Sequence, residues 1–480
     1  MCIAVLLQRC VEQDFLESNL SQITKDLTSR NIATCNLQRL ASWQGGIIIN
    51  QEEYSYDLVY KEMIRLSSSM PIGRVVALVG DYSFHYLTTL FALIYNKCII
   101  SPLLPRDLCF DMGNLFEFIY DSYSKQMQTC SNTTSKPLIE SLKKQNRAGL
   151  VLFSSGSTGK PKAIVHDLDS MLETYLAKRQ NLLRVANVFL PNHIAGIDVL
   201  FSTISSCGKL IIPKDRNPEV ILQSLSEHKV EVLPASPTML RLLLLNNLNL
   251  YDLTSLKLII YGSERADLGL LSALQEALPH IKLKQSFGTS ETNAIKIKNH
   301  NSKDGYFKIL ECDYKIINNE LFLRPKSSGL GYINSDIAML DNEGYFATGD
   351  IVQTLKVEGE EYIKIIARSK EVINIGGEKV IPQEVEKVLL QIPFIKHCIV
   401  YGEQSNIMGQ MVCAKVVLDT QNLESILKTT KPLQVIPNAM EIKKFIRIFC
   451  KDKLAPYKIP TKINIVESIA ISERFKTVRQ

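Results

Sequence analysis

Residues 152–162 read Leu-Phe-Ser-Ser-Gly-Ser-Thr-Gly-Lys-Pro-Lys, so that a short apolar run leads directly into hydroxyls, two glycines and two lysines. Gly156 and Gly159 permit the backbone conformations that a nest of N–H groups around an anion requires. The hydroxyls add hydrogen-bond donors, and Lys160 adds positive charge. We therefore predict a phosphate-binding loop, with an ordinary Ser/Gly-rich surface loop as the alternative. The candidate residues are Ser154, Ser155, Gly156, Ser157, Thr158, Gly159 and Lys160.

The spacing within this loop differs from that of a Walker A loop. Gly156 lies only three residues before Gly159, and Pro161 stands where a Walker A loop has the Ser or Thr that binds Mg²⁺. A P-loop nucleoside triphosphatase is therefore not predicted.

Short β-branched runs alternate with helix-length amphipathic segments on both sides of the loop. The predicted strands are residues 75–79, 98–104, 150–153, 210–212, 230–233 and 256–261, and a helix is predicted over 84–95. This alternation is typical of an α/β fold with a doubly wound, largely parallel sheet. Beyond residue 304, shorter strand-like pieces joined by turns predict a small β subdomain.

A smaller α+β unit is predicted after Lys370. Its clearest helix begins at Pro382, carries apolar residues at helical spacing, and stops before Pro393. We therefore predict a large N-terminal domain over residues 1–369 and a small C-terminal domain over residues 370–480.

The composition is that of an ordinary globular protein, with 46% hydrophobic and 22% charged residues among 480. The longest apolar stretch, from Tyr86 to Leu104, is interrupted by Asn96 and Lys97, so we expect no transmembrane span. The N-terminus lacks the basic region of a signal peptide, and the 11 cysteines are scattered without a C-x-x-C pair. These features predict a cytoplasmic protein with reduced thiols and no zinc site.

The net charge of +6 is carried by the C-terminal part of the chain. Residues 370–480 contain 17 Lys and Arg against 11 Asp and Glu, whereas the two signs balance in residues 1–369. Such a basic portion fits an anionic partner, and a solvated surface is the alternative. We expect no nucleic-acid partner, and the sequence leaves the oligomeric state open.

Seven further motifs follow the loop in order along the chain. They are Pro191-Asn-His-Ile-Ala-Gly196, Tyr261-Gly-Ser-Glu264, Phe287-Gly-Thr-Ser-Glu291, Tyr345-Phe-Ala-Thr-Gly-Asp350, Arg368-Ser-Lys370, Asn374-Ile-Gly-Gly-Glu378 and a terminal Lys476. Together with the loop, this series resembles the adenylate-forming superfamily of acyl-CoA synthetases, peptide-synthetase adenylation domains and luciferases. The resemblance covers roughly residues 75–479 and is strongest to the acyl-CoA synthetase-like ligases.

The resemblance implies an ATP- and Mg²⁺-dependent acid:thiol ligase. Such an enzyme activates a carboxylic acid as an acyl-adenylate, releases pyrophosphate, and transfers the acyl group to CoA or to the phosphopantetheine of a carrier protein. The acid would be a fatty or aryl acid. The alternative is a degenerate member that binds an adenylate as a sensor or scaffold without turnover, because Ala470 and Phe475 depart from the family's pattern before the tail lysine. A luciferase-like oxygenase would share the same adenylation residues.

The resemblance also implies roles for individual residues. The glycine-rich loop would hold the β- and γ-phosphates, Thr289 and Ser290 the α-phosphate, and Glu291 the Mg²⁺ ion, with an ordinary exposed acid as the alternative for Glu291. Asp350 would accept hydrogen bonds from the ribose hydroxyls, assisted by Arg368. The adenine slot and its surroundings would consist of Gly262, Ser263, Glu264, Phe287 and Gly288.

Phe287 stands where the family usually has Tyr, and a core aromatic is its plain alternative. Lys476 would bridge the carboxylate and the α-phosphate, unless it is a solvated tail lysine. Lys370 would be the hinge of a mobile C-terminal domain, and Gly376 and Gly377 would line a channel for the thiol arm.

His193 would lie beside the route of the carboxylate and the thiol, although a lone His is more often structural. Ala195 stands where the peptide-synthetase version places an Asp for an α-amino group, and Asp198 is three residues away. This departure disfavours an α-amino acid as the substrate.

Overall fold

The computed structural model of the protein describes residues 3–4, 7, 45–109, 114–131, 133–154, 161–176, 181–301, 304–325, 328–335, 337–405, 409–419 and 438–469. Its packing divides the chain into two compact units. The first comprises Met1–Gly305, Ile309–Asp313 and Leu323–Phe346, and the second comprises Tyr306–Lys308, Tyr314–Phe322 and Ala347–Gln480. The domain boundary between residues 369 and 370 stays a prediction.

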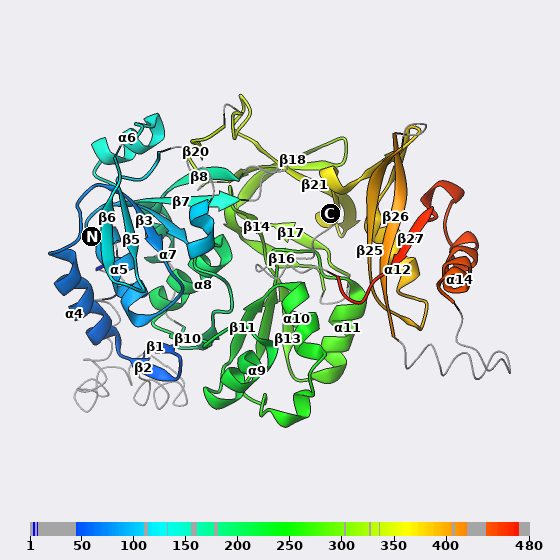
Figure 1. The fold of residues 1–480 in the computed structure, drawn as a ribbon, viewed down its shortest axis with the longest axis horizontal. Coiled ribbons are helices and arrows are strands. Elements are labelled where there is room, and N and C mark those ends of the chain that lie inside the picture. The colour runs from blue at the N-terminus through cyan, green and yellow to red at the C-terminus, as the bar shows by residue number, and fades with distance from the viewer. Residues whose placement is uncertain are drawn as a thin grey trace. The chain divides into compact units, whose positions relative to one another are not determined.

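Two seven-stranded sheets form the framework of the first unit (Figure 1). The first sheet runs in the order β13-β12-β11-β9-β10-β1-β2 and contains β1 (Gly46–Ile49), β2 (Glu52–Tyr54), β9 (Arg184–Ala186), β10 (Lys209–Ile212), β11 (Val232–Ala235), β12 (Leu258–Tyr261) and β13 (Lys282–Gln285). The second runs β20-β8-β7-β4-β3-β5-β6 and contains β3 (Val75–Val79), β4 (Ile99–Leu103), β5 (Phe118–Asp121), β6 (Gln126–Thr129), β7 (Gly149–Ser154), β8 (Lys162–Asp167) and β20 (Gly331–Tyr332). All six predicted strands are present, and the α/β fold class is confirmed.

Most of the described helices of the first unit begin at a residue whose side chain caps the first turn. They are α4 (Tyr56–Ser67), α5 (Phe84–Tyr95), α6 (Pro137–Lys144), α7 (Leu168–Leu176), α8 (Ile194–Ser205), α9 (Pro218–Glu227), α10 (Pro237–Leu244) and α11 (Leu268–Ala277). Ser55, Ser83 and Ser236 each accept a hydrogen bond from a backbone N–H of the first turn. α6, α9 and α10 start with proline, which has no N–H to leave unpaired there. The helix predicted over residues 84–95 is confirmed as α5.

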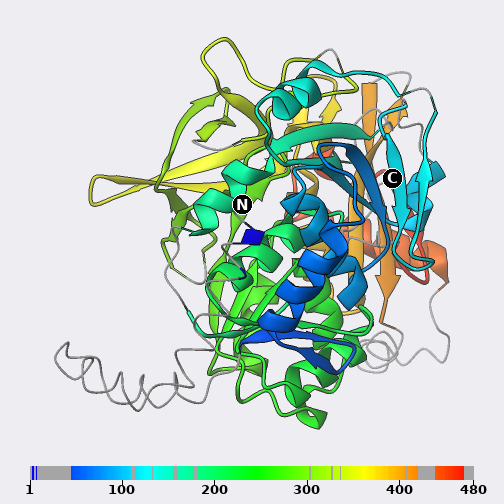
Figure 2. The same ribbon diagram turned by 90° about the vertical axis from the view of Figure 1, so that its left-hand side faces the viewer.

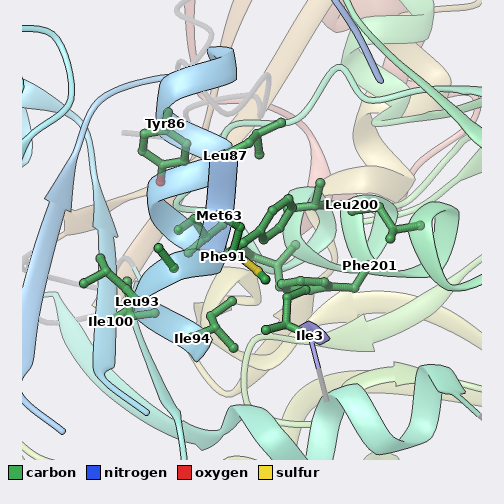
Figure 3. Close-up of a cluster of buried hydrophobic side chains, with 14 of the residues drawn as sticks. Ile3, Met63, Tyr86, Leu87, Phe91, Leu93, Ile94, Ile100, Leu200 and Phe201 are labelled. Atoms are coloured by element: carbon green, nitrogen blue, oxygen red, sulfur yellow. The ribbon is translucent and has the colours of Figure 1, made fainter. Parts of the chain in front are cut away.

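Helix α5 is the centre of the largest hydrophobic core. Every residue from Tyr86 to Ile94 is buried, because the helix packs against neighbours on all sides. Figure 3 shows Phe91 of α5 among Met63 of α4 and Phe201 of α8. The ring centroids of Phe91 and Phe201 lie 6.3 Å apart. Figure 2 shows α4 and α5 side by side, in blue.

The remaining strands include the long antiparallel pair β21 (Phe346–Val357) and β22 (Glu360–Arg368). Their sheet continues with β17 (Phe307–Ile309), β18 (Cys312–Ile317) and β19 (Glu320–Pro325) in the order β17-β22-β21-β19-β18. Another sheet of the second unit contains β23 (Ile373–Ile375), β24 (Glu378–Val380), β25 (Ile395–Ser405), β26 (Gly409–Leu418) and β27 (Lys462–Ile465).

Helices α12 (Pro382–Leu389) and α14 (Ala439–Lys451) contribute Val385 and Ile446 to the hydrophobic core of that sheet. The predicted helix therefore begins at Pro382, although its regular part ends at Leu389. Among the described residues, no helix is long and apolar enough to cross a membrane.

The packing of α5 makes a stability prediction. Phe91→Ala should destabilise the first unit by about 3–5 kcal/mol, because it leaves a cavity in a close-packed core. Urea unfolding followed by circular dichroism measures the loss. Ile72→Ala, at a side chain that is 73% exposed, is the control and should change stability by less than about 0.5 kcal/mol. A loss for Phe91→Ala no larger than that of the control would contradict the packing.

Candidate functional site

The two ends of the glycine-rich loop are held together by strand pairing. Ser154 ends β7, Lys162 begins β8, and these two residues are antiparallel partners. Strands β7 and β8 are therefore neighbouring antiparallel strands inside a buried sheet, and the residues that flank the loop are paired. Six of its predicted residues, Ser155, Gly156, Ser157, Thr158, Gly159 and Lys160, lie outside the described residues.

The Phe287–Glu291 motif forms a tight turn between β14 (Phe287–Thr289) and β15 (Asn293–Ile295). Thr289 Oγ1 accepts hydrogen bonds from the backbone N–H groups of Glu291 and Thr292, at 3.2 and 3.1 Å. The backbone N–H of Thr289 donates to Oγ1 of the buried Thr292 at 3.1 Å. A Cβ on Gly288 would lie 2.1 Å from the carbonyl oxygen of Asn293, so this position requires glycine. The turn thereby presents residues 289–291 on a fixed backbone.

The side chain of Glu291 is held through one of its two carboxylate oxygens. Tyr332 Oη donates to Glu291 Oε1 at 3.0 Å, and no hydrogen bond from a described residue reaches Oε2. Burial and the neighbouring carboxylate raise the pKa of Tyr332, which therefore stays protonated at neutral pH. Among the described residues there is no cluster of three or more His, Cys, Asp or Glu side chains that could hold a metal. A single open carboxylate fits Mg²⁺, which proteins often bind through one or two carboxylates together with substrate phosphates.

The Tyr261–Glu264 motif follows β12. Ser263 has a positive φ of 68°, and a Cβ on Gly262 would lie 2.1 Å from Ser286 Oγ. Glu264 accepts hydrogen bonds from the Thr238 hydroxyl at 2.6 Å and from the Thr238 backbone N–H at 3.2 Å. Because Thr238 lies in the first turn of α10, the carboxylate also faces the positive end of the helix dipole. Glu264 is thus tied to the protein and fixes the backbone of the motif.

Phe287 is largely buried, with 7% of its surface exposed, and its partner across the β14–β15 ladder is Ile295. This environment is that of a core aromatic. Stacking of its ring on an adenine base stays a prediction.

Asp350 and Arg368 are directly opposite each other in the β21–β22 ladder of the second unit. Arg368 Nε lies 2.8 Å from Asp350 Oδ1, and Arg368 Nη1 donates to the carbonyl of Thr348 at 2.9 Å. Asp350 is only 1% exposed, and its Oδ2 has no hydrogen-bond partner among the described residues. Burial raises the pKa of Asp350 to about 6 against the opposing effect of Arg368. A buried carboxylate with one open oxygen fits a ligand that donates hydrogen bonds, as a ribose diol does.

His193 is the N-cap of α8. Its Nδ1 accepts from the backbone N–H of Ala195 at 3.1 Å, and its ring stacks on Phe189 at 5.7 Å. The cap places the proton of the neutral ring on Nε2. These contacts give His193 a structural role, and its predicted catalytic role stays a prediction. Asp198 accepts a hydrogen bond from Tyr175 Oη at 2.7 Å, so this carboxylate already has a partner within the protein.

Gly376 and Gly377 form the two-residue turn between β23 and β24. Their φ angles are 55° and 93°, and two successive positive values are typical of the turn that joins two antiparallel strands. The turn alone accounts for the glycine pair, and a role in thiol binding stays a prediction. Lys370 lies in the short helical turn Ser369–Glu371 and is exposed. Lys476 lies outside the described residues.

The structure brings some of the predicted residues into contact, and it shows further residues beside them that were not predicted. In the first unit, Glu291 is linked through Tyr332 to β8 and hence to the stem of the glycine-rich loop. In the second unit, Asp350 and Arg368 form a pair. Thr292, Tyr332 and Asn334 were not predicted from the sequence. The only local signal was the position of Thr292 beside the Phe287–Glu291 motif.

Comparison with known proteins identifies the family. Residues 117–333 match the family model described as AMP-binding enzyme, and residues 384–476 match that of the AMP-binding enzyme C-terminal domain. A 2-succinylbenzoate–CoA ligase of Listeria innocua serovar 6a is 25% identical over 473 residues, covering 90% of this chain and 94% of the relative. The corresponding ligase of Listeria monocytogenes serotype 4b is 26% identical over 342 residues, covering 68% of this chain and 67% of the relative.

Two solved structures share the fold. The o-succinylbenzoate CoA synthetase MenE of Bacillus subtilis, in complex with its acyl-adenylate intermediate, has a TM-score of 0.67 at 20% identity and covers 92% of this chain and 96% of its own. ATP-bound MatB from Rhodopseudomonas palustris has a TM-score of 0.73 at 16% identity and covers 90% of this chain and 93% of its own. With both halves of the family matched in order, the chain belongs to the adenylate-forming, AMP-binding enzyme family.

Proposed function

We propose that the protein is an ATP-dependent carboxylic acid:CoA ligase that works through an acyl-adenylate. The observation that carries the proposal is the presence of both parts of the AMP-binding enzyme family in one chain. Relatives that are named as CoA ligases support this assignment. The degenerate alternative rests on Ala470 and Phe475 alone, and both lie outside the described residues.

In the first half-reaction, a carboxylate oxygen attacks the α-phosphorus of ATP. A P–O bond forms, the bond to the bridging oxygen of the β-phosphate breaks, and pyrophosphate leaves with that electron pair. Catalysis of such a transfer depends mainly on positioning and on charge neutralisation. The protein's part is therefore to hold the triphosphate in line with the acid.

Thr289 is suited to contact the α-phosphate. Its oxygen accepts from two backbone N–H groups, so its own proton is available for Thr292 or for a phosphate oxygen. Glu291 would hold Mg²⁺, which when bound neutralises phosphate charge. Asp350 would bind the ribose through its open oxygen, and Lys476 would offset the repulsion between the carboxylate and the α-phosphate.

In the second half-reaction, the thiol sulfur attacks the carbonyl carbon of the adenylate. A C–S bond forms, AMP leaves with the electrons of the C–O bond, and the thiol proton passes to solvent. CoA is favoured as the acceptor because several relatives are named as CoA ligases. The positive excess of the C-terminal 111 residues suits an anionic acceptor of either kind. CoA is an anion, so this charge favours its encounter.

The acid is expected to lack an α-amino group. Ala195 stands at the position of the amino-binding Asp, and Tyr175 already engages Asp198. 2-Succinylbenzoate and anthranilate are the first acids to test, because a relative and a structural neighbour are named for them. We also infer a cytoplasmic location, because the described cysteines are free thiols.

The assignment is tested with purified protein, ATP, Mg²⁺ and a panel of aryl, fatty and dicarboxylic acids. At least one acid should support pyrophosphate exchange, and mass spectrometry should detect its acyl-adenylate and, with CoA, its thioester. Lys476→Ala should lower the exchange about 10²- to 10³-fold by analogy with the loss of one charge-stabilising group. Lys451→Ala, at an exposed lysine of α14, is the control and should retain full exchange. ATP binding without exchange for any acid would instead favour the degenerate binder, and transfer only to a carrier protein would overturn CoA as the acceptor.

The raised pKa of Asp350 predicts that nucleoside binding depends on pH. Because its pKa is raised to about 6, the carboxylate that accepts hydrogen bonds is present above this pH and becomes protonated below it. Adenosine, which has no phosphate to titrate, should bind about tenfold more weakly at pH 5 than at pH 7. Isothermal titration calorimetry measures the affinity, and Asp350→Asn should bind weakly at both pH values. An affinity of the unaltered protein that is constant from pH 7 to pH 5 would contradict the role of Asp350.

A further inference from the structure

Strand β20 connects two parts of the candidate site that are distant in the sequence. Gly331 and Tyr332 pair antiparallel with Val165 and Ile164 of β8. The pairing extends beyond the strand, because the Leu330 N–H donates to the Val165 carbonyl at 2.7 Å and the Ile333 N–H donates to the Ala163 carbonyl at 3.1 Å. Strand β8 directly follows the glycine-rich loop in the chain, so pairing with β20 restricts the movement of the backbone at that end of the loop.

Asn334 continues this pairing through its side chain. Its Oδ1 accepts from the Ala163 N–H at 2.8 Å, and its Nδ2 donates to the Pro161 carbonyl at 2.7 Å. The oxygen and the nitrogen of this side-chain amide thus both make hydrogen bonds to the backbone that directly follows the loop. We call these two hydrogen bonds of the Asn334 side chain the bracket. Asn334 and Ala163 are 171 positions apart in the sequence, so the bracket is a tertiary contact.

The same segment holds Glu291 at two places. The Gly329 N–H donates to the Glu291 backbone carbonyl at 2.7 Å, and Tyr332 Oη donates to its carboxylate at 3.0 Å. The ring of Tyr332 also lies under Lys162, whose Nζ is 4.5 Å from the ring centroid. Tyr332 therefore touches both the first residue of β8 and the carboxylate expected to bind Mg²⁺.

We propose that Tyr332 is a positioning residue that presents Glu291 to Mg²⁺, and that β20 and Asn334 keep this carboxylate in register with β8, the strand that follows the glycine-rich loop. The inference rests on the proposed function. A glutamate has three side-chain torsions, and a hydrogen bond to one oxygen removes much of this freedom before the ion binds. Glu291 Oε2 would then be held in place to bind Mg²⁺, and the same segment fixes the backbone at Pro161 and Ala163, directly after the glycine-rich loop.

Tyr332→Phe tests the proposal by removing one hydroxyl. ATP binding is measured by calorimetry over a series of Mg²⁺ concentrations without any acid, so the readout does not require turnover. The Mg²⁺ concentration for half-maximal ATP binding should rise about tenfold, the size expected for one hydrogen bond to a charged group. Adenosine binding without Mg²⁺ should stay unchanged.

Tyr362→Phe is the matched control, because Tyr362 belongs to none of the motifs and its Oη makes the same kind of hydrogen bond to Glu360, at 2.9 Å. Its Mg²⁺ dependence should equal that of the unaltered protein. In a Glu291→Gln background, Tyr332→Phe should have no further effect, because the carboxylate that it positions is gone. An unchanged Mg²⁺ requirement in Tyr332→Phe, or an equal shift in both backgrounds, would overturn the proposal.

Asn334→Ala tests the second part. It should weaken ATP binding both with and without Mg²⁺. The backbone that follows the loop loses two hydrogen bonds, and this loss does not depend on the metal. Thermal unfolding of each variant establishes that it is folded. Unchanged ATP affinity in folded Asn334→Ala would overturn the bracket. Failure of the ligase assignment would appear separately, as absent pyrophosphate exchange in the unaltered protein with its Mg²⁺-dependent ATP binding intact.

Discussion

The antiparallel pairing of β7 with β8 is the constraint on which the proposed phosphate-binding loop depends. A loop of glycines and hydroxyls has high conformational entropy, and it can bind a phosphate tightly only if its ends are fixed in advance. Ser154 and Lys162 are fixed because they end a ladder whose interior residues are buried. The strand β20 then adds a third partner to this hairpin and brings Tyr332 with it. The buried sheet is thus the support of the loop.

The two candidate carboxylates follow one physical pattern. Glu291 and Asp350 each have one oxygen engaged by a neighbouring side chain, Tyr332 in one case and Arg368 in the other. Their other oxygens have no hydrogen-bond partner among the described residues. Glu291 is only partly buried, whereas Asp350 is buried. Burying an unsatisfied acceptor costs free energy, and a fold tolerates this cost at Asp350 where a ligand supplies the missing partner. The raised pKa of Asp350 reflects this cost in the free protein.

The glycines of the motifs differ in what they do. Gly288 is required because a side chain would collide with the backbone of Asn293. Gly376 and Gly377 are required because a tight turn needs positive φ at both positions. A sequence motif shows the same residue type in both cases. Only the structure separates close approach from turn conformation.

The sequence by itself was sufficient for the α/β alternation, the helix at Phe84–Tyr95, the family and the order of the motifs, because periodicity and glycine or proline placement are local properties of the chain. It could not reveal Tyr332 or Asn334 as parts of the site, since a two-residue strand has no periodicity and its partner lies far away in the chain. It also could not show that His193 caps α8 or that Tyr175 engages Asp198. Those outcomes depend on which side chains meet in space, and tertiary packing alone decides that.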